Sequence, residues 1–287
     1  MSPSLSGSSG VFGIIGHPVC HSLSPAMQNE ALQACGLDGV FVPFDVQPER
    51  LGEAVAGLRS LGIRGVNVTI PHKTGVVPYL DELDESAAAA GAVNTIRNED
   101  GRLIGYNTDG DGLVRSLTEE FAFTPGENTV VVIGAGGAAR GAVAALCRAG
   151  ARRIIVVNRS RERAETLVAA MEGRYPAVAL EVTGCGEQLT PSLPKASLVV
   201  NTTSLGMNNE VITGLDLNAL NRNAVVYDMV YAPPVTPLLR EAHRLGLRHG
   251  NGLGMLAAQG ELAFRIWTGI MPPPGLMRRV LAQICAS

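Results

Sequence analysis

The feature that most constrains the fold is a glycine-rich segment that follows a run of β-branched residues. Val130–Ile133 is apolar, Gly134, Gly136 and Gly137 come next, and an alanine-rich stretch continues to Arg140. Consecutive β-branched residues favour a strand that is buried on both faces of a parallel sheet. Glycines after such a strand permit a tight turn, in which backbone N–H groups and the start of the next helix face an anion. The segment therefore predicts a βαβ unit that binds the pyrophosphate of a dinucleotide.

Length and composition limit the classes of protein to consider. The chain has 287 residues, which at about 150 residues per domain indicates two domains. Hydrophobic residues make up 46% and charged residues 17%, so a sizeable core is expected and disorder is not. A net charge of −3 and an aromatic content of 4% give no indication of nucleic-acid or membrane-surface binding. No apolar run reaches the roughly 18–20 residues of a membrane span.

The terminus and the cysteines indicate the compartment. Residues 1–10 are rich in Ser and Gly and lack the charged start of a signal peptide, so we expect a loose tail. The five cysteines form no CxxC pair and no His/Cys cluster with metal spacing, so we expect no metal site. Dispersed, odd-numbered thiols favour a reducing cytoplasm. These cysteines are Cys20, Cys35, Cys147, Cys185 and Cys285.

Strands and helices are expected to alternate along the chain. In the first half we predict strands at 11–16, 40–46 and 66–70, helices at 49–61 and 86–90, and a helix that Ser24 caps and Pro25 begins. A hairpin is expected from 92–97 to 103–107 with its turn at 98–101, followed by a helix at 109–120. In the second half we predict strands at 154–157, 198–200 and 224–227, and helices at 161–171, 236–245, 255–268 and 276–285.

The end of the second strand of the nucleotide unit indicates which dinucleotide binds. Asn158, Arg159 and Ser160 stand where an NAD-binding unit usually places Asp or Glu for the ribose 2′-hydroxyl. A carboxylate would repel a 2′-phosphate, whereas guanidinium groups match phosphate geometry. Arg161 and Arg163 follow closely, and we interpret the pattern as NADP rather than NAD. The alternative is a solvated basic start of a helix.

Reduction of a carbonyl also needs a proton donor, and the candidate is Lys73. It follows the expected strand 66–70, and the carboxyl ends of strands are where ligand crevices open in α/β folds. Asp109 is the natural partner, since a carboxylate would hold the ammonium in place. Taken by spacing alone, Lys73 is more often a surface charge and Asp109 more often a helix cap.

Several polar residues lie in loops or at strand ends of the same half of the chain. Together they would form a lining of hydroxyl and amide groups for a polyhydroxylated ligand, although each alone is more often a cap or a turn residue. They are Ser22, Ser24, Asn67, Thr69 and Asn94.

These residues resemble the shikimate dehydrogenase family along about residues 11–270. The ordered motifs that carry the resemblance are Gly16–Asn29 with its His-Ser-x-Ser-Pro core, Asn67–Lys73, Gly91–Thr95, Asn107–Gly110, Gly134–Ala138, Asn158–Ser160, Tyr227–Tyr231 and Asn251–Gln259. The chain departs from the family pattern at two places on the cofactor side. Asn251 stands where relatives often carry Asp, and the residues Asn208-Asn209-Glu210-Val211 lack the expected Gly/Pro pattern.

The resemblance implies reversible, NADP-dependent reduction of 3-dehydroshikimate to shikimate, a step of chorismate and aromatic amino-acid biosynthesis. It implies Lys73 and Asp109 as the catalytic pair. The implied substrate contacts are Ser22 and Ser24 for the carboxylate, with Asn67, Thr69, Asn94, Tyr231 and Gln259. The implied cofactor contacts are Gly134, Ala135, Gly136, Gly137, Ala138, Asn158, Arg159, Ser160, Arg163, Thr202, Met229, Gly252 and Met255.

The fold that the resemblance implies is α/β with two domains. Residues 1–109 and 252–287 would form an α/β substrate-binding and catalytic domain. Residues 110–251 would form a Rossmann-like, doubly wound parallel-sheet domain that binds NADP, and closure of the cleft would exclude water. We expect a small-molecule substrate, a monomer or homodimer, and neither nucleic acid nor membrane as a partner.

Other functions stay open at this point. One is a quinate/shikimate dehydrogenase with relaxed substrate or cofactor use, and another is a paralogue with aminoshikimate or other specificity. Ser22 and Ser24 favour shikimate, because quinate carries an extra hydroxyl at the carboxylate-bearing carbon. A non-catalytic sensor that regulates transcription is a third, and Lys73, Asp109 and the lack of an added DNA-binding segment argue against it.

Overall fold

The computed structural model describes residues 5–184, 186 and 189–286, which form two compact units. The first unit contains the chain up to Gly112 together with the chain from Leu256 onward, and the second contains Leu113–Met255. Two helices span the boundaries between the units in sequence, α4 (Asp109–Phe121) and α8 (Leu253–Thr268). Cys185 lies outside the described residues, as do residues 1–4 of the expected tail.

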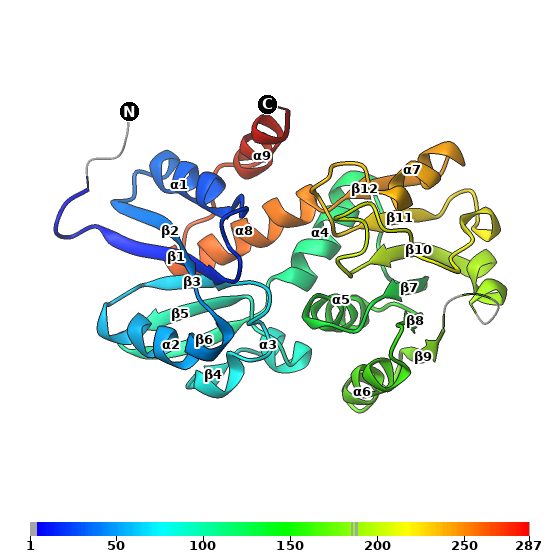
Figure 1. Ribbon diagram of the computed structural model, residues 1–287, viewed down its shortest axis with the longest axis horizontal. Helices are drawn as coiled ribbons and strands as arrows, with labels where there is room; N and C mark the ends of the chain where they lie inside the picture. Colours follow the sequence, from blue (N-terminus) through cyan, green and yellow to red (C-terminus); the bar gives the residue numbers. More distant parts are fainter. Residues whose placement is uncertain (1–4, 185, 187–188, 287) are drawn as a thin grey trace. The chain divides into compact units, whose positions relative to one another are not determined.

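The first unit is built on a six-stranded mixed sheet with the order β2-β1-β3-β5-β6-β4 (Figure 1). Strands β1, β2 and β3 are parallel, and β5 runs antiparallel to both β3 and β6. The strands are β1 (Gly10–Gly16), β2 (Gly39–Asp45), β3 (Gly65–Val68), β4 (Glu82–Leu83), β5 (Thr95–Glu99) and β6 (Arg102–Tyr106). The other helices are α1 (Ser24–Ala34), α2 (Leu51–Ser60), α3 (Glu85–Ala90) and α9 (Leu276–Ala286), with 3₁₀ turns η1 (Pro48–Arg50) and η2 (Val77–Tyr79).

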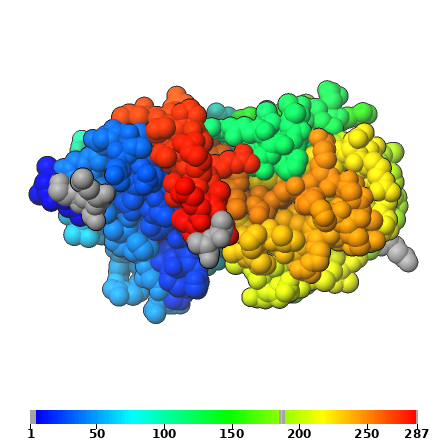
Figure 2. Space-filling model, turned by 90° about the horizontal axis from the view of Figure 1, so that it is seen from above, coloured from blue at the N-terminus to red at the C-terminus, as the bar shows by residue number. Residues whose placement is uncertain are grey.

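Aromatic side chains join α8 to this sheet. The indole N–H of Trp267 donates to the Ile96 carbonyl at 2.9 Å. The ring centroid of Trp267 lies 5.6 Å from that of Phe12 and 5.9 Å from that of Phe41. Gly65 in β3 lies directly beneath the indole, where a Cβ would collide with the ring. Helix α9 then packs against α1, and Figure 2 shows this C-terminal helix in red beside the blue N-terminal residues.

The contact between Gly65 and the indole predicts that Gly65→Ala is destabilising. We expect a loss of about 1–3 kcal/mol in the free energy of unfolding, because an added methyl group must displace a packed ring. The protein has one tryptophan, so its fluorescence during urea unfolding reports this contact directly. Gly57→Ala in α2 is the control, since nothing lies within 4 Å of its added methyl and the helix should gain up to about 1 kcal/mol. Equal midpoints for the two variants would contradict the prediction.

The second unit contains an all-parallel sheet with the order β12-β11-β10-β7-β8-β9. The chain runs outward from β7 to β9 and then returns to place β10 on the other side of β7, which makes the boundary between β7 and β10 a topological switch point. The strands are β7 (Thr129–Ile133), β8 (Arg153–Val157), β9 (Ala179–Thr183), β10 (Ala196–Asn201), β11 (Val225–Asp228) and β12 (Arg248–Asn251). The helices are α5 (Gly137–Arg148), α6 (Arg161–Glu172) and α7 (Pro237–Arg244), with 3₁₀ turns η3 (Thr190–Lys195) and η4 (Leu217–Ala219).

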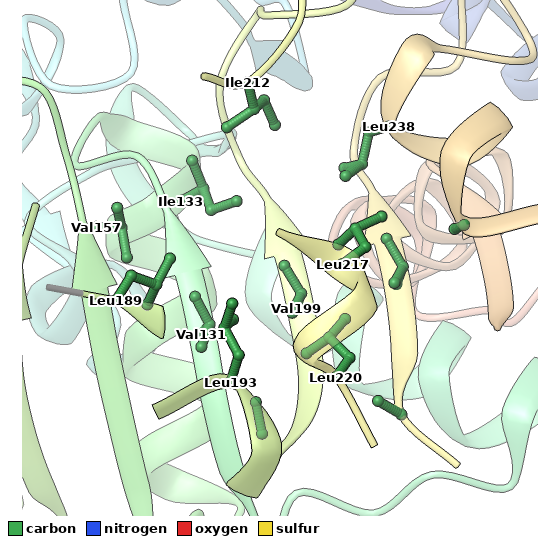
Figure 3. Close-up of a cluster of buried hydrophobic side chains, with 14 of the residues drawn as sticks. Val131, Ile133, Val157, Leu189, Leu193, Val199, Ile212, Leu217, Leu220 and Leu238 are labelled. Carbon is green, nitrogen blue, oxygen red and sulfur yellow. The ribbon is translucent and has the colours of Figure 1, made fainter. Parts of the chain in front are cut away.

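Alternate residues of these strands form a buried core on one face of the sheet. Val131 and Ile133 of β7, with Val199 of β10, meet Leu217 of η4 and Leu238 of α7 (Figure 3). Helix α5 packs against β7, and α6 packs against β8 and β9. The predicted α/β fold with a doubly wound parallel sheet is confirmed.

Some local predictions are wrong. Leu23, not Ser24, is the N-cap of α1, and Ser24 is its buried first residue. The tail prediction fails for its described part, because the hydroxyls of Ser6, Ser8 and Ser9 donate to Asp38 and Gly10 begins β1. These hydroxyl groups lower the pKa of the Asp38 carboxyl.

Candidate active site

The candidate cofactor residues of the second unit come from one row at the carboxyl edge of the sheet. The strands end in register at Val157, Ile133, Asn201, Asp228 and Asn251. The residue after each of these is one of the candidates, namely Asn158, Gly134, Thr202, Met229 and Gly252. Parallel strands that stop together bring distant segments of sequence to a single ligand edge.

The glycine turn leaves an unblocked helix N-terminus at this edge. Gly134 has a φ of 117°, which favours glycine, and a side chain there would collide with Thr202. Gly136 is the N-cap of α5 and makes no side-chain cap, and nothing lies within 4 Å of the space that a Cβ would occupy. The first N–H groups of a helix lack intrahelical partners, and within the described residues no side chain accepts from those of α5. Ala135, Gly137 and Ala138 complete a cradle that fits a pyrophosphate.

Two guanidinium groups without partners among the described residues follow β8, the strand next to β7. Arg159 follows β8 and Arg163 lies in the first turn of α6, and within the described residues neither side chain forms an ion pair or hydrogen bond. Arg161 differs, because it pairs with Glu165 at 2.8 Å. The Asn158 amide donates to the Ser160 carbonyl at 2.8 Å and shapes the turn before α6. The site therefore offers positive charge suited to a phosphate beside β8.

The remaining cofactor candidates lie where β11 and β12 end. The N–H of Met229 donates to the Asn201 carbonyl at 3.0 Å, and Gly252 lies so close to Met229 that a Cβ would overlap its carbonyl. Met255 is buried, and its N–H donates to the Tyr227 hydroxyl at 3.2 Å. These contacts fix the backbone positions of Met229, Gly252 and Met255 in the second unit.

The candidate catalytic residues of the first unit are in direct contact. Lys73 Nζ donates to Asp109 Oδ2 at 2.6 Å, and the two side chains are 17% and 7% exposed. Burial at this level makes the pair more than a solvated surface contact. Asp109 is the first residue of α4, and its second carboxylate oxygen accepts from Asn94 Nδ2 at 2.9 Å.

Asn94 is the centre of the polar network around this pair. Its Nδ2 also donates to Thr108 Oγ1 at 2.9 Å and to Gln259 Oε1 at 3.4 Å. Its Oδ1 accepts from the Thr108 N–H at 2.8 Å, and because a backbone N–H can only donate, this bond sets the orientation of the amide. The structure thus brings Lys73, Asp109, Asn94 and Gln259 together, and their roles stay a prediction.

Asn67 shows an unmet hydrogen-bonding capacity next to this network. Its Nδ2 donates to the Asn94 carbonyl and to Thr95 Oγ1, both at 3.2 Å. Its Oδ1 is buried and has no partner. Buried polar atoms are nearly always hydrogen-bonded, so this oxygen is suited to accept from a ligand hydroxyl.

The other candidate substrate residues follow the neighbouring strands β1 and β3. Thr69 comes directly after β3, and its N–H donates to the Ile15 carbonyl at 2.9 Å. Ser24 is 4% exposed, and its N–H donates to Ser22 Oγ at 3.3 Å, which places the two serines in one turn. Tyr231 belongs to the second unit, and its grouping with these residues stays a prediction.

Two residues near these sites were missed by the sequence analysis. Thr108 contacts Asn94 through both its N–H and its hydroxyl, although only its neighbours were singled out. Arg140 lies in the first turn of α5, and its side chain forms no ion pair or hydrogen bond within the described residues. Long side chains in a helix lean back over the preceding turn. Its signal in the sequence is an arginine four positions after Gly136.

Comparison with known proteins identifies the family. Family models match residues 14–96 (shikimate dehydrogenase substrate binding domain), 117–232 (shikimate/quinate 5-dehydrogenase) and 252–282 (shikimate 5′-dehydrogenase C-terminal domain). The shikimate dehydrogenase (NADP⁺) of Geobacter metallireducens is 52% identical over 286 residues, covering 98% of this chain and 99% of that protein. The chain belongs to the shikimate dehydrogenase family.

Solved structures of family members share the whole fold. The Thermus thermophilus shikimate 5-dehydrogenase, in complex with NADP(H) and shikimate, is 36% identical with a TM-score of 0.85, covering 96% of this chain and 99% of that one. Quinate dehydrogenase from Corynebacterium glutamicum, in complex with NAD, is 30% identical with a TM-score of 0.86, and the match covers 96% of this chain and 99% of that one. The predicted family is therefore confirmed.

The two departures from the family pattern have local explanations. Asn251 donates from Nδ2 to the Pro234 carbonyl at 3.0 Å and accepts from the Leu253 N–H at 3.1 Å, a pair of bonds that Asp cannot make. The loop after Gly206 is organised by Glu210. Backbone N–H groups of Glu210 itself and of Asn208, with the Asn208 side chain and the Gly206 N–H, lower the pKa of the Glu210 carboxyl.

The described residues contain no group of three or more His, Cys, Asp or Glu side chains that could hold a metal ion. Within the same part of the chain, no helix is long and apolar enough to cross a membrane. Cys20, Cys35, Cys147 and Cys285 are free, and burial raises the pKa of the Cys147 thiol to about 12.

Proposed function

We propose that the chain is an NADP-dependent shikimate dehydrogenase, an oxidoreductase that reversibly reduces 3-dehydroshikimate to shikimate. The observation that carries the proposal is the buried contact between Lys73 and Asp109 in a member of this family. Its relatives at about half identity over their full length carry the same activity in their names. The reaction belongs to chorismate and aromatic amino-acid biosynthesis.

Lys73 is the proposed proton donor for reduction. When bound, NADPH supplies the hydride to the C3 carbonyl carbon, and the Lys73 ammonium supplies the proton to the oxygen. Asp109 Oδ2 holds the ammonium in place, and Asn94 holds Asp109 through its other oxygen. The reverse reaction returns a proton to the neutral lysine. General acid catalysis of this kind contributes typically about 10²–10⁴-fold.

The substrate is held by groups of matching hydrogen-bonding character. Ser22 and Ser24 are assigned to the carboxylate, because hydroxyl groups can donate to it. Asn67 Oδ1 accepts from a ring hydroxyl, which its buried and unpartnered state supports. The further ring contacts are Thr69, Asn94, Gln259 and Tyr231.

The cofactor residues follow the order of the sheet. The glycine turn after β7 holds the pyrophosphate, and Arg159 and Arg163 beside β8 hold the 2′-phosphate. The nicotinamide half then extends over β10 and β11, on the other side of β7, toward Thr202, Met229, Gly252 and Met255. The unpaired guanidinium groups and the uncapped start of α5 support these assignments.

A quinate/shikimate dehydrogenase with relaxed choice of substrate or cofactor is the second candidate. The similarity to a quinate dehydrogenase bound to NAD favours it. Ser22 and Ser24 favour shikimate, and Arg159 in place of an acidic residue favours NADP.

A two-by-two assay separates these functions. Shikimate and quinate are each oxidised with NADP and with NAD, and the absorbance of the reduced nicotinamide is followed. We expect shikimate with NADP to have the highest kcat/KM. Equal rates with NAD at saturation would contradict the cofactor assignment, and no absorbance change with any pair would contradict an enzyme and favour a sensor.

The proposal also covers the domains, the oligomeric state and the cellular location of the enzyme. We expect the two units to act as a substrate domain (1–109 with 252–287) and an NADP domain (110–251). We also expect a monomer or homodimer located in the cytoplasm, without nucleic-acid partners. Size-exclusion chromatography with light scattering tests the oligomeric state.

A further inference from the structure

A buried carboxylate without a cationic partner lies at the end of β11. Asp228 is fully buried, and no ion pair within the described residues includes it. Burial raises the pKa of its carboxyl, although hydrogen bonds from Thr236, Val230 and Asn201 act in the opposite direction. Buried acidic residues are usually paired with a cation, so the burial of Asp228 without one indicates a specific role.

The three polar groups that hydrogen-bond to Asp228 within the described residues all donate to it. Oδ1 accepts from Asn201 Nδ2 at 2.9 Å and from the Val230 N–H at 3.0 Å, and Oδ2 accepts from the Thr236 hydroxyl at 2.6 Å. The orientation of the Asn201 amide is set independently, because its Oδ1 accepts from the Thr203 N–H at 3.0 Å. An ionised carboxylate, which only accepts, fits this arrangement.

These bonds join the two loops that flank the carboxyl ends of β10 and β11. Asn201 also donates to the Leu205 carbonyl at 3.0 Å and thereby holds the loop that follows Thr202. Val230 is held by Asp228 and accepts from the Gly252 N–H at 3.3 Å, which connects this loop to the end of β12. The candidate cofactor residues Thr202, Met229 and Gly252 therefore all lie in segments that Asp228 helps to hold. Asp228 binds Asn201 and Val230 directly, and it is connected to Gly252 through Val230.

The order of the sheet places this charge on the nicotinamide side. Asp228 pairs in register with Asn201, which pairs with Ile133, so its side chain lies on the same face of the sheet as Ile133. Figure 3 shows Ile133 and Val199 in the core on this face. The pyrophosphate cradle follows β7, and the 2′-phosphate residues follow β8 on one side. The other half of an extended dinucleotide must then lie over β10 and β11, next to Asp228.

We propose that Asp228 is a positioning residue of the cofactor site, and that its buried negative charge favours the oxidised cofactor, whose nicotinamide ring is cationic, over the neutral reduced form. Charges in partly buried surroundings interact much more strongly than in water. Positioning affects the affinity for both forms of the cofactor, whereas the charge changes the ratio of the two affinities. The inference rests on the proposed function, because it takes NADP as the ligand.

The test compares the affinities of NADP⁺ and NADPH by calorimetry at one salt concentration. In Asp228→Asn the amide can still accept from Asn201 and Val230 and donate to Thr236, but the charge is gone. We expect the Kd of NADP⁺, divided by that of NADPH, to rise about tenfold relative to the unmodified protein. Thr236→Val is the matched control, since it removes the hydroxyl that donates to Asp228 and accepts from the Leu239 N–H but keeps the charge, and it should leave the ratio within twofold.

An unchanged ratio in a folded Asp228→Asn protein overturns the proposal, even if both affinities fall. Asp228→Ser is a second neutral variant in case the first does not fold. The unmodified protein supplies an independent measurement. NADP⁺ should bind about tenfold tighter than 2′-phospho-ADP-ribose, which lacks the nicotinamide, and equal affinities would overturn the proposal. If the unmodified protein bound neither form of the cofactor, the proposed function itself would fail.

Discussion

Replacing Lys73 with alanine is expected to lower kcat by about 10²–10⁴ while the affinities for cofactor and substrate stay within about tenfold. The contact with Asp109 holds the Lys73 ammonium in place, and an ammonium group can donate a proton. Its loss removes an interaction made mainly in the transition state, so kcat should fall far more than KM rises. Steady-state assays in both directions, with calorimetric binding of NADP⁺ and shikimate, measure the two effects separately.

The chain offers a matched control for this experiment. Lys195 is the only other lysine, and it is exposed in the 3₁₀ turn η3 of the second unit. Lys195→Ala should keep normal kinetics. Lys73→Arg keeps the positive charge, but a guanidinium holds its proton too tightly to release it. This variant should therefore bind shikimate and still have a low kcat. Near-normal turnover in Lys73→Ala would exclude the lysine as the proton donor.

The glycine-rich unit was predictable because its signals are local. A run of β-branched residues, a turn that needs glycine and an alanine-rich helix occupy one continuous stretch, and β7, Gly134 and α5 follow it closely. Parallel strands also end at a common edge, so residues after separate strands could be assigned to one site before their contacts were known.

The strands that the sequence analysis missed are all at the edges of sheets. β4, β9 and β12 are the terminal strands in their sheets, and each has at least one exposed or half-buried face. An edge strand with a partner on one side only does not need the continuous apolar run that marked β7. Edge strands of this kind carry no strong pattern and are therefore easily taken for loops.

The central role of Asn94 could not be predicted either. Its amide joins Thr108 and Asp109 to Gln259, which lies 165 residues away in sequence. Motifs identify which residues belong to a site, but the partners of each hydrogen bond depend on how the chain folds back. The same reason explains Ser24, whose predicted capping role gives way to burial beside Ser22.

Replacing Arg159 with glutamine is expected to weaken NADPH binding by about 10–100-fold and to leave NADH binding within about twofold. The guanidinium is exposed and has no ion pair or hydrogen bond among the described residues, so no internal contact is lost with it. A bidentate arginine–phosphate contact is strong, and glutamine retains polarity without the charge. The kcat/KM for NADPH and for NADH, measured with saturating 3-dehydroshikimate, gives the preference directly.

Arg161 supplies the control for this prediction, because it lies two residues away and its guanidinium is engaged by Glu165. Arg161→Gln should change the cofactor preference little, whereas Arg163→Gln should reduce it in the same sense as Arg159→Gln. Since a 2′-phosphate contact is electrostatic, the preference of the unmodified protein should also fall as salt rises, and that of Arg159→Gln should depend on salt less. Equal losses for NADPH and NADH in Arg159→Gln would instead place this arginine at the adenine or pyrophosphate, and the choice of NADP would then need another cause.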